Sequence, residues 1–289
     1  MSRLSIVLTF AILAVRAATA LQQSGSHIDH VPIAVRDLPA AVAQFRSLGF
    51  TIKPGRPHQN GIGNASIKFG DGSYIELITT HDGSDALARQ YQEFLKTQEG
   101  AAYVFVRDDE SHSFSRRVQL AGGRRQDAGP FAFTELPSSW LAPHLQLIEY
   151  LSPAQEPPGT YQHANGARRV VAVWTFVEHD DDPIVRELGA GASGVPAYAF
   201  EQRSARPVRF AQGTCLMLTR RGAHDPPRSL AAAILIEVDS LIQLKEAARL
   251  DGAISHGPAV WLPPSAMHGV WLGFVEKSKW DGCMCAPAK

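Results

Sequence analysis

One order of elements recurs along the chain, and this recurrence restricts the fold more than any other feature. Between residues 27 and 80 a β-type run, "HVPIAV", precedes an amphipathic run, "LPAAVAQFRSLGF", and three short extended runs follow. Four apolar residues of the amphipathic run fall at helical spacing: Leu38, Val42, Phe45 and Leu48. The pattern therefore predicts a strand, a helix and three further strands, in that order.

The same order repeats in looser form further along the chain. Later units begin at "AAYVFVRDD", "RRVVAVWTFVE" and "AAILIEVDS", and each continues with a helical run and further extended runs. One such unit covers only one face of its sheet with a helix, so two units must combine to bury the rest. We expect an α+β fold of tandem βαβββ modules that form concave mixed sheets, with helices outside and a cleft for a small ligand.

Connectors rich in proline and glycine separate these units. "SPAQEPPGTYQHANG" lies between the second and third units, and "RRGAHDPPRS" lies between the third and fourth. We expect a first module pair at residues 27–152, a second and divergent pair at 160–277, and a flexible tail at 278–289.

The first twenty residues differ from the rest of the chain. Arg3 precedes an apolar run over residues 4–15, and small residues follow up to Ala20. This pattern is typical of a secretory signal peptide, and the run is too short to span a bilayer comfortably. We expect cleavage after Ala20 and a secreted or periplasmic protein with no membrane span after signal removal. The alternative is a retained anchoring helix.

Composition narrows the choice of partners. The chain has 28 basic and 28 acidic side chains, so no net positive charge favours nucleic acid or an anionic membrane surface. A small molecule is the expected partner, and homo-oligomerisation stays open. Three cysteines are too few for a disulfide framework. Cys215 is expected in the core, whereas Cys283 and Cys285 lie in the tail, where a soft metal or a small bridge is the alternative to an unstructured terminus.

Two polar residues interrupt strands that otherwise look buried. In "YIELI" the side chain of Glu76 shares a strand face with Tyr74 and Ile78, which predicts that it points into the concave sheet. An ionised carboxylate there is costly unless a cation or hydrogen-bond donors satisfy it. His30 lies at the mouth of the first strand, and an imidazole with a carboxylate is a reasonable pair of ligands for a divalent ion. At solvated positions the same residues would have no such meaning.

The segment from residue 27 to 80, and above all "GDGSYIELI", resembles the start of the glyoxalase-like domain of the vicinal oxygen chelate superfamily. The resemblance is weaker through "HLQLIEY" and "QHANGARRV" and faint beyond. It implies paired modules around a cleft that usually holds a divalent metal, which the substrate chelates through adjacent oxygens. It places metal ligands at His30 and Glu76, makes Glu76 the candidate for proton transfer, and makes Asn64 a substrate-polarising amide. The metal could be Zn, Ni, Fe or Mn.

The second module should supply the remaining ligands. Two alignments of "HLQLIEY" compete: one nominates Gln146, with His144 on the same face, and the other nominates Glu149. Strand alternation allows only one set to face the cleft, and we prefer Gln146 because Leu145 and Leu147 would then lie under the helix. The resemblance adds His163 at the cleft rim, although a connector histidine can equally be solvated.

Two functions from different classes remain. The first is a metal-dependent lyase, isomerase or ring-cleaving dioxygenase with metal ligands His30, Glu76, Gln146 and His163. The second is a metal-free protein that sequesters a small molecule against Trp174, Trp261 or Trp271. The second module pair departs from the metal pattern, because Gly273 stands where the family often has glutamate and His268 is the only tempting polar residue there.

Overall fold

The structure is a computed structural model of the 289-residue chain. It describes residues 26–56, 58–108, 112–137, 145–152, 156–157, 159–178, 183, 198–200, 203–210 and 213–280. The expected signal peptide, His144, Cys283 and Cys285 lie outside the described residues.

The first unit has the predicted order of elements. Its elements are β1 (His27–Ala34), α1 (Leu38–Ser47), β2 (Lys53–Pro54), β3 (Ile62–Lys68) and β4 (Tyr74–Thr80). Helix α1 begins after Asp37, whose side chain accepts a hydrogen bond from the Ala40 amide at 2.9 Å and so caps the helix. Strand β1 pairs in parallel with β4, and β3 pairs antiparallel with β4.

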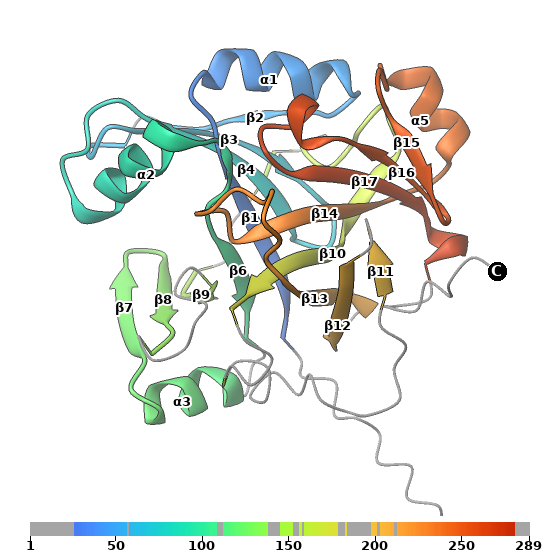
Figure 1. The fold of residues 1–289 in the computed structure, drawn as a ribbon. Helices are drawn as coiled ribbons and strands as arrows, with labels where there is room; N and C mark the ends of the chain where they lie inside the picture. Colours follow the sequence, from blue (N-terminus) through green and yellow to red (C-terminus); the bar gives the residue numbers. More distant parts are fainter. Residues whose placement is uncertain are drawn as a thin grey trace, which may run out of the picture.

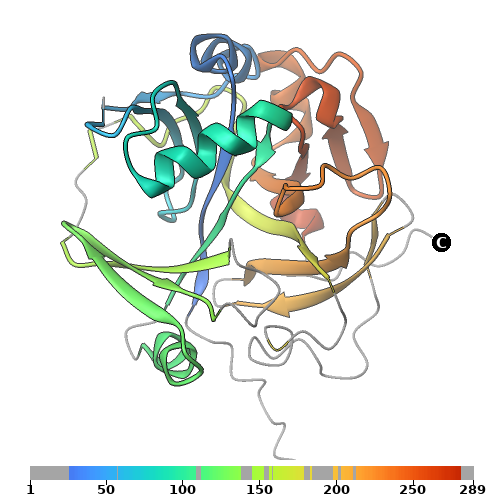
Figure 2. The ribbon, with the colours of Figure 1, turned by 60° about the vertical axis from the view of Figure 1, so that its left-hand side comes forward.

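A helix that the repeat did not predict joins the first unit to the second. It is α2 (Ala86–Thr97), capped by Asp85, and its buried face consists of Ala88, Tyr91, Phe94 and Leu95. This face packs over the concave side of the first half, so α2 covers part of the cleft instead of lying outside the sheet. Figure 2 shows α2 in front of β1.

The second unit continues the first sheet. Its elements are β5 (Gly100–Ala101), β6 (Val104–Arg107), α3 (Ser113–Leu120), β7 (Arg124–Ala128), β8 (Phe131–Glu135) and β9 (Leu145–Tyr150). Strands β1 and β6 pair antiparallel, and β6 pairs in parallel with β9. The two units therefore share a mixed sheet, as expected.

The remaining elements form the second half of the molecule. They are β10 (Ala167–Val177), β11 (Tyr198–Phe200), β12 (Arg203–Arg209), β13 (Cys215–Arg220), β14 (Ala231–Val238), α5 (Leu241–Ala247), β15 (Ile254–His256), β16 (Ala259–Leu262) and β17 (Trp271–Glu276), with short 3-10 turns at Pro264–Ala266 and Lys277–Lys279. Strands β10 and β14 pair antiparallel, and a pairing of Ala231 with Ala101 connects this half to β5. Helices α1 and α5 lie together at the top of the molecule in Figure 1, where the Arg249 amide donates to the Ser47 carbonyl.

The concave face of the second half is filled by its own side chains. Trp174 and Trp261 are 1% and 0% exposed and meet edge to face, with ring centroids 5.5 Å apart. A Cβ atom added at Gly273 would lie 2.5 Å from the Trp261 ring, so this strand position must be glycine for the indole to pack there. The glutamate expected from the family pattern is therefore replaced by a packing surface. Trp174 and Trp261 do not line an open ligand site, which corrects that part of the sequestration hypothesis.

Cys215 is buried, as predicted, and it is also disulfide-bonded. None of the helices in the described ranges is long and apolar enough to cross a membrane.

Candidate functional site

A row of directly paired residues crosses the concave face of the first half. Lys68 of β3 pairs with Tyr74 of β4, and Tyr74 pairs with His30 of β1. His30 in turn pairs with Phe105 of β6, which pairs with Gln146 of β9. Side chains at directly opposite positions lie on the same sheet face, so the pairing brings residues from five strands into one line.

The centre of this row is a stack of rings formed by Tyr74, His30 and Phe105. The His30 ring lies 4.3 Å from Tyr74 and 4.1 Å from Phe105, with interplanar angles of 8° and 6°. The Lys68 ammonium lies 3.2 Å from the centroid of the Tyr74 ring and extends the stack by a cation–π contact. Because both faces of the imidazole are covered and His30 is 4% exposed, its two nitrogens point in fixed directions.

The carboxylate of Asp29 contacts one nitrogen of this imidazole. The β1–β6 register shifts between Ile28 and His30, a bulge that turns Asp29 toward its neighbour. Asp29 is 1% exposed, and its Oδ1 lies 2.6 Å from His30 Nδ1 and accepts from the Tyr150 hydroxyl at 3.0 Å. A carboxylate here favours a proton on Nδ1, so the lone pair of Nε2 is available on the other side of the ring.

Glu76 lies on that other side. Its Oε2 is 3.9 Å from His30 Nε2, while its Oε1 accepts a hydrogen bond from Asn64 Nδ2 at 2.6 Å. The 3.9 Å separation is longer than a hydrogen bond of about 3.2 Å. The His30 and Glu76 side chains are 5% and 16% exposed, so both groups are largely shielded from solvent. Asn64, expected as a substrate-polarising amide, instead donates to Glu76 and holds it in position.

Charge and burial set the protonation of the surrounding groups. Burial lowers the pKa of Lys68, and the carboxylates of Asp29, Glu156 and Glu76 oppose that effect. Burial raises the pKa of Tyr74 well above its ordinary value, and burial also raises the pKa of Tyr150. The two phenols are therefore uncharged at neutral pH, and the carboxylates favour the charged form of Lys68.

The structure distinguishes the two alignments of the second module. Leu145 and Leu147 are buried, and Gln146 faces the concave side next to Phe105, as the preferred alignment predicts. Glu149 has the opposite alternation and forms an ion pair with Arg125, and its Oε1 lies 3.7 Å from His112 Nε2. Gln146 nevertheless lies two strands from His30, roughly 9.5 Å by strand spacing, with Phe105 between them. Gln146 therefore shares the sheet face of His30 but does not lie beside it.

His163 is not part of this site. Its Nδ1 accepts from the Thr51 amide at 3.1 Å, and its Nε2 lies 3.0 Å from the Lys68 carbonyl oxygen, to which it donates. Burial lowers the pKa of His163, which favours the neutral ring that this pattern requires. A ligand role would require both hydrogen bonds to break, so the expectation of His163 as a metal ligand is corrected to a role in attaching the connector to the first half.

The second-half candidate His268 lies apart from the ring stack. Its Nδ1 is 2.9 Å from Glu99 Oε2, and its backbone has a positive φ of 51°. Glu99 also accepts from the Arg36 amide at 2.6 Å. This contact joins the two halves of the molecule.

The donor set supports a divalent ion at His30 and Glu76, but only with two protein ligands. Both groups are oriented by outer hydrogen bonds, from Asp29 and Asn64, as is usual for metal ligands. Across the described ranges no group of three His, Cys, Asp or Glu side chains is arranged to hold a metal. The pair therefore fits a site in which His30 and Glu76 supply two ligands and the other coordination positions are open to water and substrate.

Sequence reasoning missed four residues around His30 and Glu76: Asp29, Phe105, Tyr150 and Lys68. Asp29 could have been found, because it directly precedes His30 at the start of a strand. Phe105, Tyr150 and Lys68 could not, because their roles depend on pairing between distant strands.

The strand pairing and the imidazole–carboxylate pair on a concave face define a protein of the vicinal oxygen chelate class. The glyoxalase-like domain family matches residues 28–189, which is more than half of the chain. The chain belongs to the glyoxalase-like domain family. No curated protein matches its sequence significantly.

Solved structures with the same fold include enzymes. The chain is similar to a hypothetical protein from Staphylococcus aureus (TM-score 0.53, 9% identity, covering 87% of this chain and 99% of that one). It is also similar to a mutant of 4-hydroxymandelate synthase from Streptomyces coelicolor (0.54, 14%, 88% and 92%). A third is 2,2',3-trihydroxybiphenyl 1,2-dioxygenase from Sphingomonas wittichii strain RW1 (0.56, 13%, 89% and 94%). At these identities the similarity shows the fold alone.

Proposed function

We propose that this protein is an exported metalloenzyme that binds a divalent ion between His30 and Glu76 and acts on a small substrate with adjacent oxygens. One observation carries the proposal: His30 Nε2 and Glu76 Oε2 face each other at 3.9 Å, while Asp29 and Asn64 bind the opposite atoms of these groups. With the proton on Nδ1, His30 Nε2 and Glu76 Oε2 are both acceptors, and a cation between them would satisfy both.

Each residue of the cluster has a separate task. Asp29 keeps the proton on His30 Nδ1, and the ring stack keeps the imidazole from rotating. Asn64 holds one oxygen of Glu76, and the other oxygen faces His30, where it would hold the ion. The Lys68 ammonium offsets the negative charge of the carboxylates. When bound, the ion would act as a Lewis acid that stabilises an anionic form of the substrate.

Analogy of fold supplies the candidate reaction classes. Two of the similar structures are named as a 4-hydroxymandelate synthase and a ring dioxygenase, which supports oxygenase chemistry as one candidate. Lyase and isomerase chemistry are the others, because one fold hosts many reactions.

A metal-free binding protein is the second candidate function. The aromatic residues packed on the concave side, including Tyr91, Phe131 and Phe133, make a flat apolar ligand the candidate. In that case Glu76 and His30 would bind a ligand directly, without an ion.

Export is part of the proposal. The disulfide of Cys215 supports it, because disulfides persist mainly in oxidising compartments. Mass spectrometry of the mature protein should give an N-terminus at residue 21, whereas a chain that retains residues 1–20 would contradict cleavage.

Calorimetry with catechol, a probe with two adjacent oxygens, separates the two functions. The wild type is titrated after dialysis with Mn²⁺ and after treatment with a chelator. A metalloenzyme should bind catechol only in the metal-loaded state, and Glu76→Gln should lose this binding. The matched control, Glu149→Gln, removes a carboxylate from the opposite sheet face and should bind as the wild type does. Equal binding with and without metal would support the sequestering function instead.

A further inference from the structure

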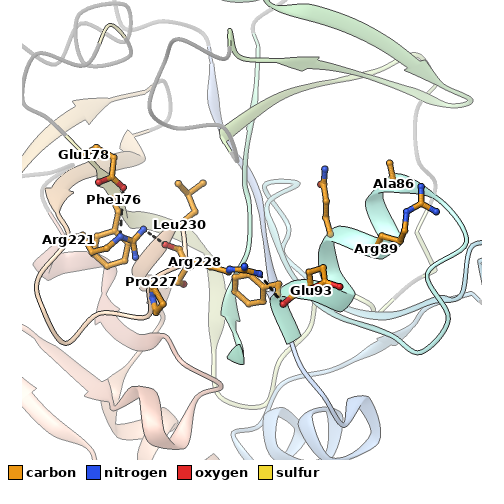
Figure 3. A pocket seen from close by; sticks show the side chains of 12 residues that line it. Ala86, Arg89, Glu93, Phe176, Glu178, Arg221, Pro227, Arg228 and Leu230 are labelled. Carbon is orange, nitrogen blue, oxygen red and sulfur yellow. Dashed lines mark hydrogen bonds and ion pairs between the residues drawn. The ribbon is translucent and has the colours of Figure 1, made fainter. Parts of the chain in front are cut away.

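A cavity of about 590 Å³ lies between the two halves of the molecule, away from His30 and Glu76. One wall is α2, and the other is formed by the end of β10 and the segment 221–230 that leads into β14 (Figure 3). We call it the seam cavity. Its volume falls in the range of about 300–1,000 Å³ that is usual for small-molecule sites.

The floor of the seam cavity is apolar. Phe94 of α2 is 7% exposed, and Phe176 and Leu230 of the second half are 2% and 4% exposed. Phe94 and Leu230 therefore bring apolar side chains from the two halves to one space, which suits the flat body of an aromatic ligand, while Arg221 covers the Phe176 ring.

The walls carry more positive than negative charge. Three arginines and two glutamates line the cavity, so the lining is cationic by one charge. One glutamate, Glu93, already pairs with Lys96 on the same helix. The second, Glu178, lies 3.9 Å from Arg221.

Two of the arginines retain donors for a ligand. Arg89 uses one guanidinium nitrogen for the Ser84 carbonyl at 3.0 Å, and Arg228 uses one for the Glu93 carbonyl at 3.1 Å. A guanidinium has five N–H donors, and within the described ranges these are the only hydrogen bonds of the two side-chain heads. Arg89 stands on the α2 wall and Arg228 on the opposite wall.

The third arginine is fixed in place. Arg221 donates to the Pro226 carbonyl and, at 2.7 Å, to the Ser229 carbonyl, and its guanidinium lies 4.3 Å from the centre of the Phe176 ring. Burial lowers the pKa of Arg221. An anion in the cavity would therefore meet one immobile guanidinium and two adaptable ones.

We propose that the seam cavity is a second binding site, and that it takes a small aromatic monoanion whose rings lie on Phe94 and Leu230. Its charged group binds Arg228 and also Arg89, which turns from the Ser84 carbonyl toward the ligand. This site is independent of the proposed metal centre. Because its walls come from both halves, a bound ligand would also connect them.

Fluorescence titration with 1-anilinonaphthalene-8-sulfonate, an aromatic monoanion, tests the proposal on the full chain. Saturable binding at one site is expected. The double variant Arg89→Gln/Arg228→Gln should bind about tenfold more weakly or worse, because two charge-assisted contacts are lost. N-phenyl-1-naphthylamine, which has the same rings without the sulfonate, should bind the wild type more weakly than the sulfonate does.

The matched control is Arg116→Gln/Arg249→Gln, which removes two exposed arginines elsewhere and has the same net charge as the test variant. It should bind the probe as the wild type does. All four substituted residues are exposed, and thermal unfolding followed by circular dichroism shows whether both variants remain folded. Glu76→Gln should leave the titration unchanged, which separates this site from the proposed function. Absence of saturable binding, equal weakening in both double variants, or equal affinity for the uncharged probe would overturn the proposal.

Discussion

Substituting Gly273 by alanine tests whether the second half is filled by its own side chains. The glycine is buried in β17 opposite Trp261, and its backbone φ is not positive. In a strand without such a neighbour, alanine would be neutral or slightly stabilising, because glycine loses more conformational freedom on folding. Here the new Cβ would lie 2.5 Å from two atoms of the Trp261 ring.

The expected effect is a clear loss of stability. The Trp261 indole is fully buried against Trp174, so it has little room to move away. Overpacking of this kind costs about 1–3 kcal/mol, and each kcal/mol corresponds to roughly 2–4 °C in melting temperature for domains of 150–250 residues. We therefore expect the urea midpoint and the melting temperature of Gly273→Ala to fall together.

Two controls make the result specific. Gly70→Ala adds a Cβ that meets nothing within 4 Å at an exposed turn, so its stability should stay within about 0.5 kcal/mol of the wild type. In a Trp261→Leu background, Gly273→Ala should lose most of its cost, which gives a coupling of about 1 kcal/mol or more. If Gly273→Ala is as stable as the wild type, the proposed packing of Trp261 on Gly273 is wrong.

Three further predictions concern buried polar groups. Asp29→Asn removes the carboxylate that orients His30, so metal affinity should fall about 10–100-fold while the fold persists. Competition with a chromophoric chelator measures this affinity, and an unchanged value would refute the orienting role of Asp29. Asn165→Ala breaks bonds to the Leu48 carbonyl and the Ala167 amide and should cost about 1–3 kcal/mol in urea unfolding, and a cost near zero would show that the connector is not held there. The pKa of His163 is lowered in the folded protein, so the unfolded chain binds more protons; this residue costs no stability above a pH of about 6.5 and destabilises the fold progressively as pH falls below it. His163→Gln should therefore flatten the decline in unfolding free energy between pH 7 and 5. An identical decline in both proteins would contradict the buried, neutral state of His163.

Much of the fold could be predicted because the units repeat. The β-type and helical runs of the first unit correspond to β1, α1, β3 and β4, and the alternation of "YIELI" placed Glu76 on the concave face as observed. Helix α2 was missed, because the repeat order contains no helix between the first and second units. Its capping residue Asp85 and the spacing of Ala88, Tyr91 and Leu95 were visible in the sequence.

The site was harder to predict than the fold. His30 and Glu76 do approach each other, because β1 and β4 pair in parallel with His30 opposite Tyr74. The bulge that brings Asp29 to His30 is a local register shift that alternation cannot reveal. His163 resembled a ligand by position, yet its surroundings are main-chain groups that only the packed connector supplies. The module boundaries at 27–152 and 160–277, the tail at 278–289 and the signal peptide remain predictions.

Metal content measured by inductively coupled plasma mass spectrometry tests the central claim most directly. The wild type, Glu76→Gln and the control Glu149→Gln are purified without chelator and compared per mole of chain. We predict close to one equivalent of a divalent ion in the wild type and in the Glu149 variant, and little in the Glu76 variant. Substoichiometric metal in the wild type, or equal metal in all three proteins, would contradict a metal centre at His30 and Glu76.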